Sequence, residues 1–269
     1  MKKSTASARQ LNLSAALLGL SVLTDAGVEH YRGSFQNRAM YVPLVSAALT
    51  LGASLMGVAD PAPKSNRGRD IVYALAAVTG LAGLGFHTYN ITKRPGGWSW
   101  LNLFYAAPVG APGALVLAGL LGGASEWLRE CDSAEAERVG RLLAAISAGG
   151  FAGTVAEVGL LHFRGAYQHP AMFLPVSVPP VAVALLARAA LKPPPRDGWV
   201  TRTWLKLTAL LGLAGVGFHA RGISRNMGGW RNRSQNILNG PPLPAPPSFT
   251  ALAIAGLAAL ALLEGRSRD

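Results

Sequence analysis

The sequence predicts an all-α integral membrane protein with about eight transmembrane helices, built as a tandem duplication of a four-helix unit with parallel repeats. Half of the 269 residues are hydrophobic and only 14% are charged, which is a low charge for a soluble domain. Apolar windows close to the length that a bilayer requires recur along the chain. A fourteen-residue motif occurs twice, which indicates the duplication.

The two copies of this motif are colinear. Residues 30–43 read HYRGSFQNRAMYVP and residues 162–175 read HFRGAYQHPAMFLP, so seven of the fourteen positions are identical. The triplet Gly-Phe-His that ends at His87 recurs at His219, with the same separation of 132 residues. Equal spacing of two motif pairs indicates an internal repeat. We expect a first four-helix repeat over 1–124, a cytoplasmic linker with a surface-lying helix over 125–141, and a second four-helix repeat over 142–269.

Eight apolar windows are the expected spans, in order Leu11–Val28, Ala39–Val58, Ile71–Phe86, Leu103–Gly122, Leu142–Leu161, Ala171–Ala187, Leu205–Phe218 and Phe249–Leu263. The first follows two lysines, as a signal peptide would. Because Asp25, Glu29 and His30 stand where a cleavage site needs small residues, we expect this window to remain as a helix. Four spans per repeat give both copies the same orientation, about a pseudo-twofold axis along the membrane normal.

The distribution of Lys and Arg predicts the orientation. With the N-terminus inside, sixteen of the 25 cationic residues fall in cytoplasmic segments, which favours both termini cytoplasmic in a bacterial-type plasma (inner) membrane. The net charge of +12 is scattered over short loops on both faces, which fits attraction to anionic lipid and argues against nucleic acid as a partner. The single cysteine, Cys131, excludes a disulfide framework and is expected to be a free structural thiol.

Two long outer loops share a second pattern. Loops 88–112 and 220–247 each contain Gly-Gly-Trp, with Trp98 and Trp230 eleven residues after the preceding histidine. Loops of this length are uncommon without a function or an internal fold, so we expect them to pack over the outer helix ends as a lid. Tryptophan prefers the bilayer interface and glycine permits a tight turn, which explains the motif without a ligand.

Four histidines end the first, third, fifth and seventh expected helices on the outer side, namely His30, His87, His162 and His219. Imidazoles on facing helices hold b-type haem in membrane bundles, and clustered imidazoles bind copper, zinc or iron. The candidate cofactors are therefore haem b or a transition metal. The sequence permits two sites, His30 with His87 and His162 with His219, or one cluster of all four.

Charged residues accompany these histidines. Arg32 and Arg164 follow them by two residues and are placed to pair with haem propionates, quinone oxygens or phosphate headgroups. Asp25 and Glu157 precede them by five residues. Because five residues rotate a helix by about 140°, these carboxylates do not share the histidine face, and we expect them to support the histidines or to ligate a metal from another direction. Met40 and Met172 are expected to serve helix packing rather than metal binding.

The histidines and arginines also have a simpler interpretation as helix caps. Cationic donors at a helix C-terminus are stabilised by the unpaired backbone carbonyls and by the negative end of the helix dipole. Four symmetric histidines nevertheless favour a membrane-embedded redox or electron-transfer subunit. Its partners would be the lipid bilayer, quinol or a periplasmic redox protein, and other membrane subunits. The alternatives are a cofactor-free accessory or structural subunit of a membrane complex, an integral-membrane metalloenzyme, and a transporter.

Overall fold

The computed structural model describes residues 2–106, 108–192 and 198–264, which form helices joined by turns and short loops, with no strand in these ranges. The long helices are α1 (Lys2–Arg32), α2 (Val42–Ala59), α3 (Arg67–Thr92), α5 (Gly110–Glu130), α6 (Ser133–Arg164), α8 (Pro179–Leu191), α9 (Trp199–Arg225) and α11 (Pro247–Glu264). The short elements are α4 (Trp100–Tyr105), α7 (Leu174–Ser177), α10 (Arg233–Asn239) and the 3-10 turns η1 (Arg38–Tyr41), η2 (Pro170–Phe173) and η3 (Gly229–Asn232).

Seven helical segments of the described chain are long and apolar enough to cross a membrane. They are Ser4–Arg32, Arg38–Ala59, Arg67–Thr92, Gly110–Glu130, Ser133–Arg164, Pro170–Leu191 and Pro247–Glu264. These segments confirm the prediction of an all-helical, multi-pass membrane protein. Helix α9 is not among the seven, and it carries cationic residues in both its first and its last turns.

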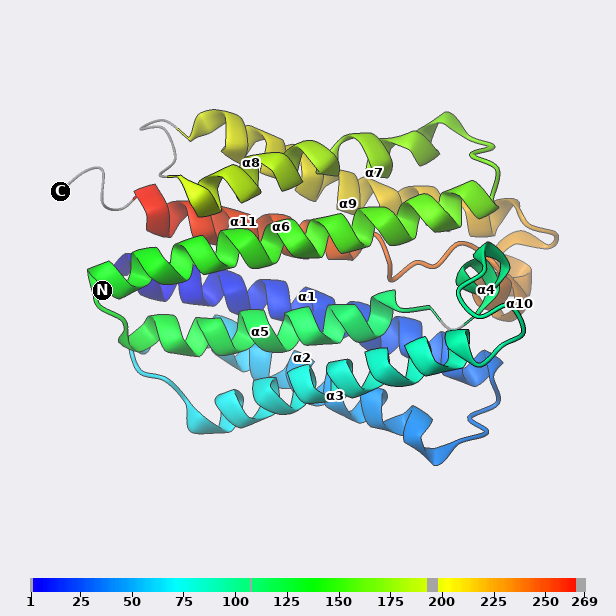
Figure 1. Ribbon diagram of the computed structural model, residues 1–269, viewed down its shortest axis with the longest axis horizontal. Coiled ribbons are helices and arrows are strands. Elements are labelled where there is room, and N and C mark those ends of the chain that lie inside the picture. Colours follow the sequence, from blue (N-terminus) through cyan, green and yellow to red (C-terminus); the bar gives the residue numbers. More distant parts are fainter. Residues whose placement is uncertain (1, 107, 193–197, 265–269) are drawn as a thin grey trace.

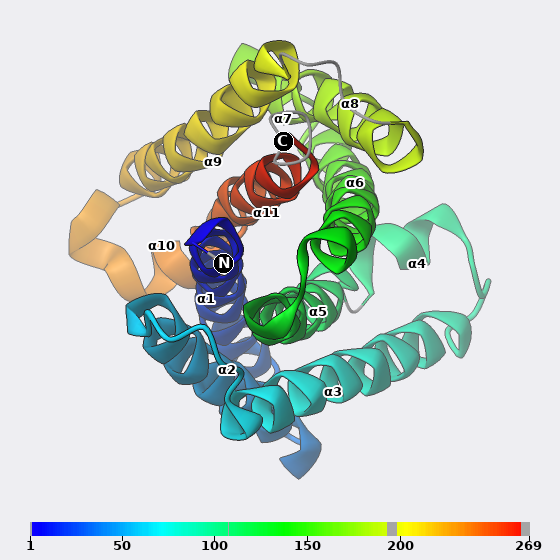
Figure 2. The same ribbon diagram turned by 90° about the vertical axis from the view of Figure 1, so that its left-hand side faces the viewer.

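The long helices run along the longest axis of the molecule, and α1 begins at the same end at which α11 finishes (Figure 1). We refer to this end as the terminal end, and to the opposite end, which carries α4 and α10, as the hairpin end. Helices α1, α5, α6 and α11 pack together in the centre, with the pairs α2–α3 and α8–α9 outside them on opposite sides (Figure 2). Of the residues expected to face the cytoplasm, Arg196, Arg266 and Arg268 lie outside the described ranges.

Small side chains let the central helices approach closely. Helix α11 buries alanine and leucine along most of its length, and a Cβ atom on Gly119 of α5 would overlap the carbonyl oxygen of Tyr73 on α3. Small residues at helix contacts are typical of membrane bundles. Large apolar side chains face outward instead, for example Leu49, Leu75 and Leu210, which are 53%, 55% and 60% exposed. Such an exterior suits contact with lipid.

The structure corrects one expected span boundary and shows a break within another span. The fourth span begins at Gly110 rather than at Leu103, because the chain becomes extended at Ala106 and residues 100–105 form the separate helix α4. The sixth span is interrupted between α7 and α8, where Pro179 and Pro180 supply no N–H groups to continue the ladder.

The linker 125–141 does not form a surface helix of its own. Helix α5 continues to Glu130 and α6 starts at Ser133, so that two residues separate them. The carboxylate of Asp132 accepts the backbone N–H of Glu135 at 2.8 Å, which is a standard N-cap. The expected helix start at Ser133 is therefore confirmed, but the helix is a span rather than a linker.

Candidate functional site

The histidines at the ends of α1 and α6 precede the same unusual turn. Two consecutive residues in each half adopt left-handed backbone conformations, namely Ser34 (φ 57°) and Phe35 (φ 44°), and Ala166 (φ 55°) and Tyr167 (φ 45°). Non-glycine residues rarely adopt positive φ, and two in succession cost conformational energy. Both halves therefore reverse the chain direction after the helix with the same backbone conformation.

This turn brings a backbone carbonyl back to each histidine. The Nδ1 atom of His30 lies 2.7 Å from the carbonyl oxygen of Met40, and that of His162 lies 2.7 Å from the carbonyl oxygen of Met172. In each case the methionine methyl group lies against the first glycine of the turn, which fits the expected packing role. The aromatic residue of the turn presents its edge to the imidazole, with ring centroids 6.2 and 6.0 Å apart.

The other two histidines hold the long loops. In α3, His87 Nδ1 is hydrogen-bonded to the carbonyl oxygen of Pro108, shortly before α5. In α9, His219 Nδ1 lies 2.6 Å from the carbonyl oxygen of Pro242, shortly before α11. All four imidazoles therefore fasten a connection at the hairpin end through the same ring nitrogen.

This bonding assigns one tautomer to all four rings. A carbonyl oxygen only accepts hydrogen bonds, so each Nδ1 must carry the proton and donate it. In the neutral ring, Nε2 then has its lone pair free. Ligating histidines in metal sites are commonly oriented in this way, with one nitrogen donating to a backbone carbonyl and the other facing the metal. In this tautomer the unprotonated Nε2 of each ring has the lone pair that a metal ligand requires.

The four histidines lie at the hairpin end, on α1, α3, α6 and α9. No ring contact or hydrogen bond joins His30 to His87, or His162 to His219, within the described ranges. No group of three or more His, Cys, Asp or Glu side chains within the described ranges has an arrangement that could hold a metal ion. The described chain therefore does not gather the four histidines into one metal cluster.

The two arginines do not point at the histidines. Arg32 Nη1 lies 2.7 Å from Glu29 Oε1. In contrast, Arg164 Nη1 donates to the carbonyl oxygen of Phe104 at 2.9 Å, and its guanidinium lies 5.4 Å from the ring centre of Tyr105. The difference follows from the sequence, because leucine stands at the position of Glu29 in the second half.

The two carboxylates occupy matching positions but have different partners. Glu157 accepts the backbone N–H of Gly110 at 2.9 Å, at the start of α5, and any Cβ atom on this glycine would collide with the carboxylate. The residue that corresponds to Gly110 is Pro244, which has no N–H to donate. Asp25 accordingly makes no hydrogen bond within the described chain. It borders a cavity of about 30 Å³ between α1 and the segment 237–244, enough for one or two waters.

Two asparagines build the long loops, and their role was not foreseen although their matching positions are visible in the sequence. The amide of Asn102 donates to the carbonyl oxygens of Pro95 at 3.1 Å and Gly97 at 2.8 Å. The amide of Asn236 donates to Met227 at 3.2 Å and to Gly229 at 2.8 Å. Both asparagines are buried. Each therefore fixes a Gly-Gly turn from within.

His169 serves the backbone in the same way as its counterpart in the first half. Its Nδ1 accepts the N–H of Ala171 at 3.1 Å, as the side chain of Asn37 accepts the N–H of Ala39 at 2.9 Å. Each contact begins a 3-10 turn. His169 thus differs from the other four histidines, whose Nδ1 atoms donate.

A buried ion cluster at the terminal end was not anticipated. The carboxylate of Glu126 is fully buried and accepts two hydrogen bonds from Arg69, at 2.8 and 2.9 Å. The guanidinium of Arg129 donates to the backbone oxygen of Gly57 at 2.8 Å. Asp60 also receives a hydrogen bond from Arg69 at 2.8 Å, and the N–H of Ala62 and this guanidinium hold the pKa of Asp60 below its usual range.

Cys131 is a free thiol, as predicted, and lies in the turn between α5 and α6. Burial and the nearby Glu135 raise its pKa to about 12. The thiolate form is therefore scarce at neutral pH, and a reactive role is disfavoured.

Comparison of the chain with known protein families, with curated proteins and with solved structures finds no match.

Proposed function

We propose that the protein is a membrane-embedded redox subunit that holds b-type haem or a transition metal at two histidine pairs, His30 with His87 and His162 with His219. One observation carries the proposal. All four imidazoles donate from Nδ1 to a backbone carbonyl, which leaves Nε2 as a ligand in every case. The bound metal would supply one-electron chemistry, while the chain orients the imidazoles and fixes their tautomer.

The position of the pairs limits the direction of electron transfer. All four histidines lie near the hairpin end, and electron transfer across a bilayer would require sites stacked from one face to the other. We infer transfer to or from a partner at this face, either quinol or a periplasmic redox protein, within an assembly that can include other membrane subunits. Neither Arg32 nor Arg164 is free for propionates in the present arrangement, since each has a protein partner.

We further infer a tandem duplication with eight spans. Helix α9 is 27 residues long, close to the 26 residues of α3, and its apolar middle runs from Leu207 to Phe218. It carries His219 where α3 carries His87, with an equivalent hydrogen bond. An even number of spans places both ends of the chain on one side. The excess of Lys and Arg at the terminal end supports a cytoplasmic location of that end in a bacterial-type inner membrane.

The test uses asparagine, which places an N–H where Nδ1–H stands but has no Nε2. Protein purified from its own membranes should contain haem, seen as a Soret band, or a stoichiometric transition metal by elemental analysis. Substituting His87→Asn or His219→Asn should remove the cofactor from one pair while the fold persists. His169→Asn is the matched control, because asparagine already performs the same capping in the first half. Cofactor content that is unchanged in both pair variants would refute the proposal.

A cofactor-free accessory subunit is the second candidate, and one observation favours it. Every one of the four imidazoles already has a structural task, which is to fasten a loop through Nδ1. On this alternative the asparagine variants should assemble and function like the wild type, whereas His→Ala variants should loosen the loops. Purified protein without any cofactor, copurifying with other subunits, would favour this role.

A further inference from the structure

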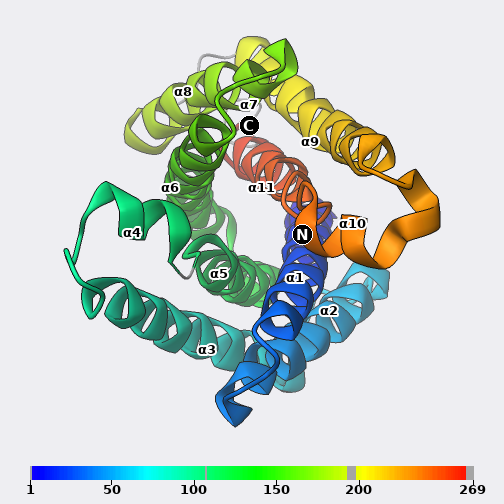
Figure 3. The same cartoon turned by 90° about the vertical axis from the view of Figure 1, so that its right-hand side faces the viewer.

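The two long connections at the hairpin end share one backbone frame. In the first, Gly96 and Gly97 have φ of 86° and 50°; in the second, Gly228 and Gly229 have φ of 80° and 51°. A buried asparagine holds each turn, as described above. Figure 3 shows that α4 and α10 lie on opposite sides of the bundle, α4 between α3 and α6, and α10 between α9 and α1. The two connections differ in the side chains that they expose.

The first connection, residues 93–105, is an aromatic hairpin. Its exposed side chains include Trp98, Trp100, Leu101 and Tyr105, which are 61%, 71%, 66% and 60% exposed. Its cations have partners, since Lys93 lies over the ring of Tyr89 and Arg94 donates to the carbonyl oxygen of Tyr105 at 3.3 Å. Such a surface suits the boundary between hydrocarbon and headgroups.

The second connection, residues 221–240, is an arginine hairpin. Four exposed arginines occur within its first thirteen residues, at Arg221, Arg225, Arg231 and Arg233. None of these side chains makes an ion pair or a hydrogen bond within the described ranges. The segment 220–246 contains no Asp or Glu that would neutralise them. The hairpin therefore presents concentrated positive charge for which the described part of the chain supplies no ion-pair partner.

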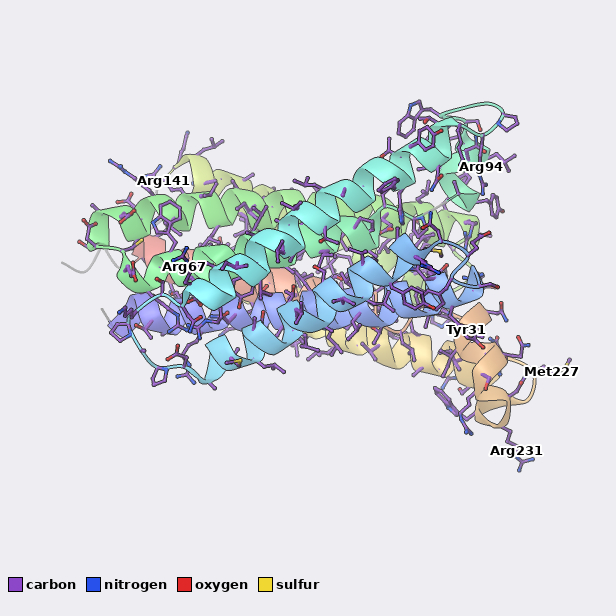
Figure 4. All side chains as sticks on the ribbon, turned by 90° about the horizontal axis from the view of Figure 1, so that it is seen from below. Tyr31, Arg67, Arg94, Arg141, Met227 and Arg231 are labelled. Carbon is purple, nitrogen blue, oxygen red and sulfur yellow. The ribbon has the colours of Figure 1, made fainter. Side chains whose placement is uncertain are left out.

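We propose that the arginine hairpin binds the phosphate headgroups of anionic phospholipids. Figure 4 shows this hairpin projecting from one side of the bundle, with Met227 and Arg231 at its far edge and Arg94 on the opposite side of the molecule. A surface beside the spans, rather than over them, meets the headgroups of the surrounding lipid. Guanidinium groups bind phosphate oxygens through paired, charge-assisted hydrogen bonds.

The apolar residues at the tip support a lipid ligand. Met227 is 92% exposed and Trp230 is 48% exposed, and both lie among the four arginines. Tryptophan is enriched at the membrane interface, where its ring meets the acyl boundary and its N–H meets water. An acidic partner protein would match the charge. Lipid is favoured because it surrounds the spans at this depth in every state of the protein.

The experiment places a fluorescent probe at the tip. Met227→Cys is labelled in a Cys131→Ser background, and the full-length protein in neutral detergent is titrated with short-chain phosphatidylglycerol or phosphatidylcholine. We expect phosphatidylglycerol to bind at least about tenfold more tightly, with an affinity that falls as salt rises. Replacing Arg225, Arg231 and Arg233 by Gln should weaken this binding by about fivefold per charge removed.

The matched control removes the same charge from the terminal end, with Lys64, Arg67 and Arg138 replaced by Gln, all of which are exposed. This variant should bind phosphatidylglycerol at the labelled tip like the wild type. Equal affinity for the two lipids, or an arginine-to-glutamine variant that binds like the wild type, would overturn the proposal. Saturation of the probe by an acidic peptide but not by phosphatidylglycerol would instead assign the hairpin to a protein partner.

Discussion

The hairpin end and the terminal end of the molecule differ in how closely the two halves agree. At the hairpin end, four histidines and two asparagines make equivalent hydrogen bonds in both halves. At the terminal end, several buried polar residues of the first half have apolar counterparts in the second half. Both solutions pack, so packing alone does not require the halves to agree. The agreement at the hairpin end lies in the hydrogen bonds that fasten the connections, and our proposal places the function at the same histidines.

The contrast at the terminal end is clearest around Tyr73. Its hydroxyl donates to Asn12 Oδ1 at 2.5 Å, and both residues are buried. The residues 132 positions later are Leu205 and Ala144, which are fully buried and apolar. Likewise, Leu260 of α11 stands where α5 carries Glu126.

The largest expected effect comes from breaking the ion cluster of the first half. Glu126→Gln removes the fully buried carboxylate that pairs with Arg69, so that the partly exposed Asp60 is the charged partner that remains. Breaking a buried pair costs about 3–5 kcal/mol. Thermal unfolding in detergent should show a clear fall in Tm. Glu130→Gln, one turn later on the same helix but exposed, is the control and should leave Tm nearly unchanged. Equal effects of the two variants would show that the cluster is not important for stability.

A smaller effect is expected at the buried hydrogen bond. Tyr73→Phe leaves Asn12 Oδ1 buried without its donor, at a cost of about 1–3 kcal/mol. Adding Asn12→Leu should restore much of the loss, because removing both polar partners with little change of shape avoids the unsatisfied group. Denaturation midpoints of the single and double variants would measure the recovery. A double variant that loses the sum of both single effects would contradict the comparison with the apolar second half.

The match between the halves is tested by the two loop asparagines. Asn102→Ala and Asn236→Ala each remove two hydrogen bonds from a Gly-Gly turn, so we expect similar local destabilisation of about 1–3 kcal/mol. Hydrogen exchange of the turn amides would report it without global unfolding. Asn239→Ala is the control, because its amide bonds only to Gln235 on an exposed part of α10. Strongly unequal effects in the two loops would show that the turns are not equivalent.

The smallest expected effect is the contribution of Asp60 to stability in acid. The folded-state pKa of Asp60 is lowered, so its stabilising contribution is present above its unfolded value, near pH 4, and is lost as the pH falls through the folded value. Asp60 is partly exposed, and we expect less than about 1 kcal/mol. Lys192 stands at the matching position of the second half. Asp60→Asn should therefore flatten the stability profile between about pH 5 and 3; an unchanged profile would contradict this assignment.

The sequence predicted the hairpin end better than the terminal end for a physical reason. The histidines were visible because two motif pairs recur at one spacing, and their bonding partners lie within 23 residues. Glu126 pairs with Arg69, 57 residues away, and in the sequence it stands in an apparently polar linker. No local pattern reveals such a contact. Likewise, hydrophobicity alone did not separate α4 from α5, because the residues of α4 are as apolar as a span.

Cofactor stoichiometry tests the central claim most directly. Haem or metal should be counted per chain in protein purified from its own membranes, for the wild type and for His87→Asn, His219→Asn and the double variant. Two equivalent pairs predict two cofactors per chain in the wild type, one in each single variant and none in the double variant, all with the fold retained. A wild-type chain without cofactor, or a double variant that keeps its full content, would contradict the account.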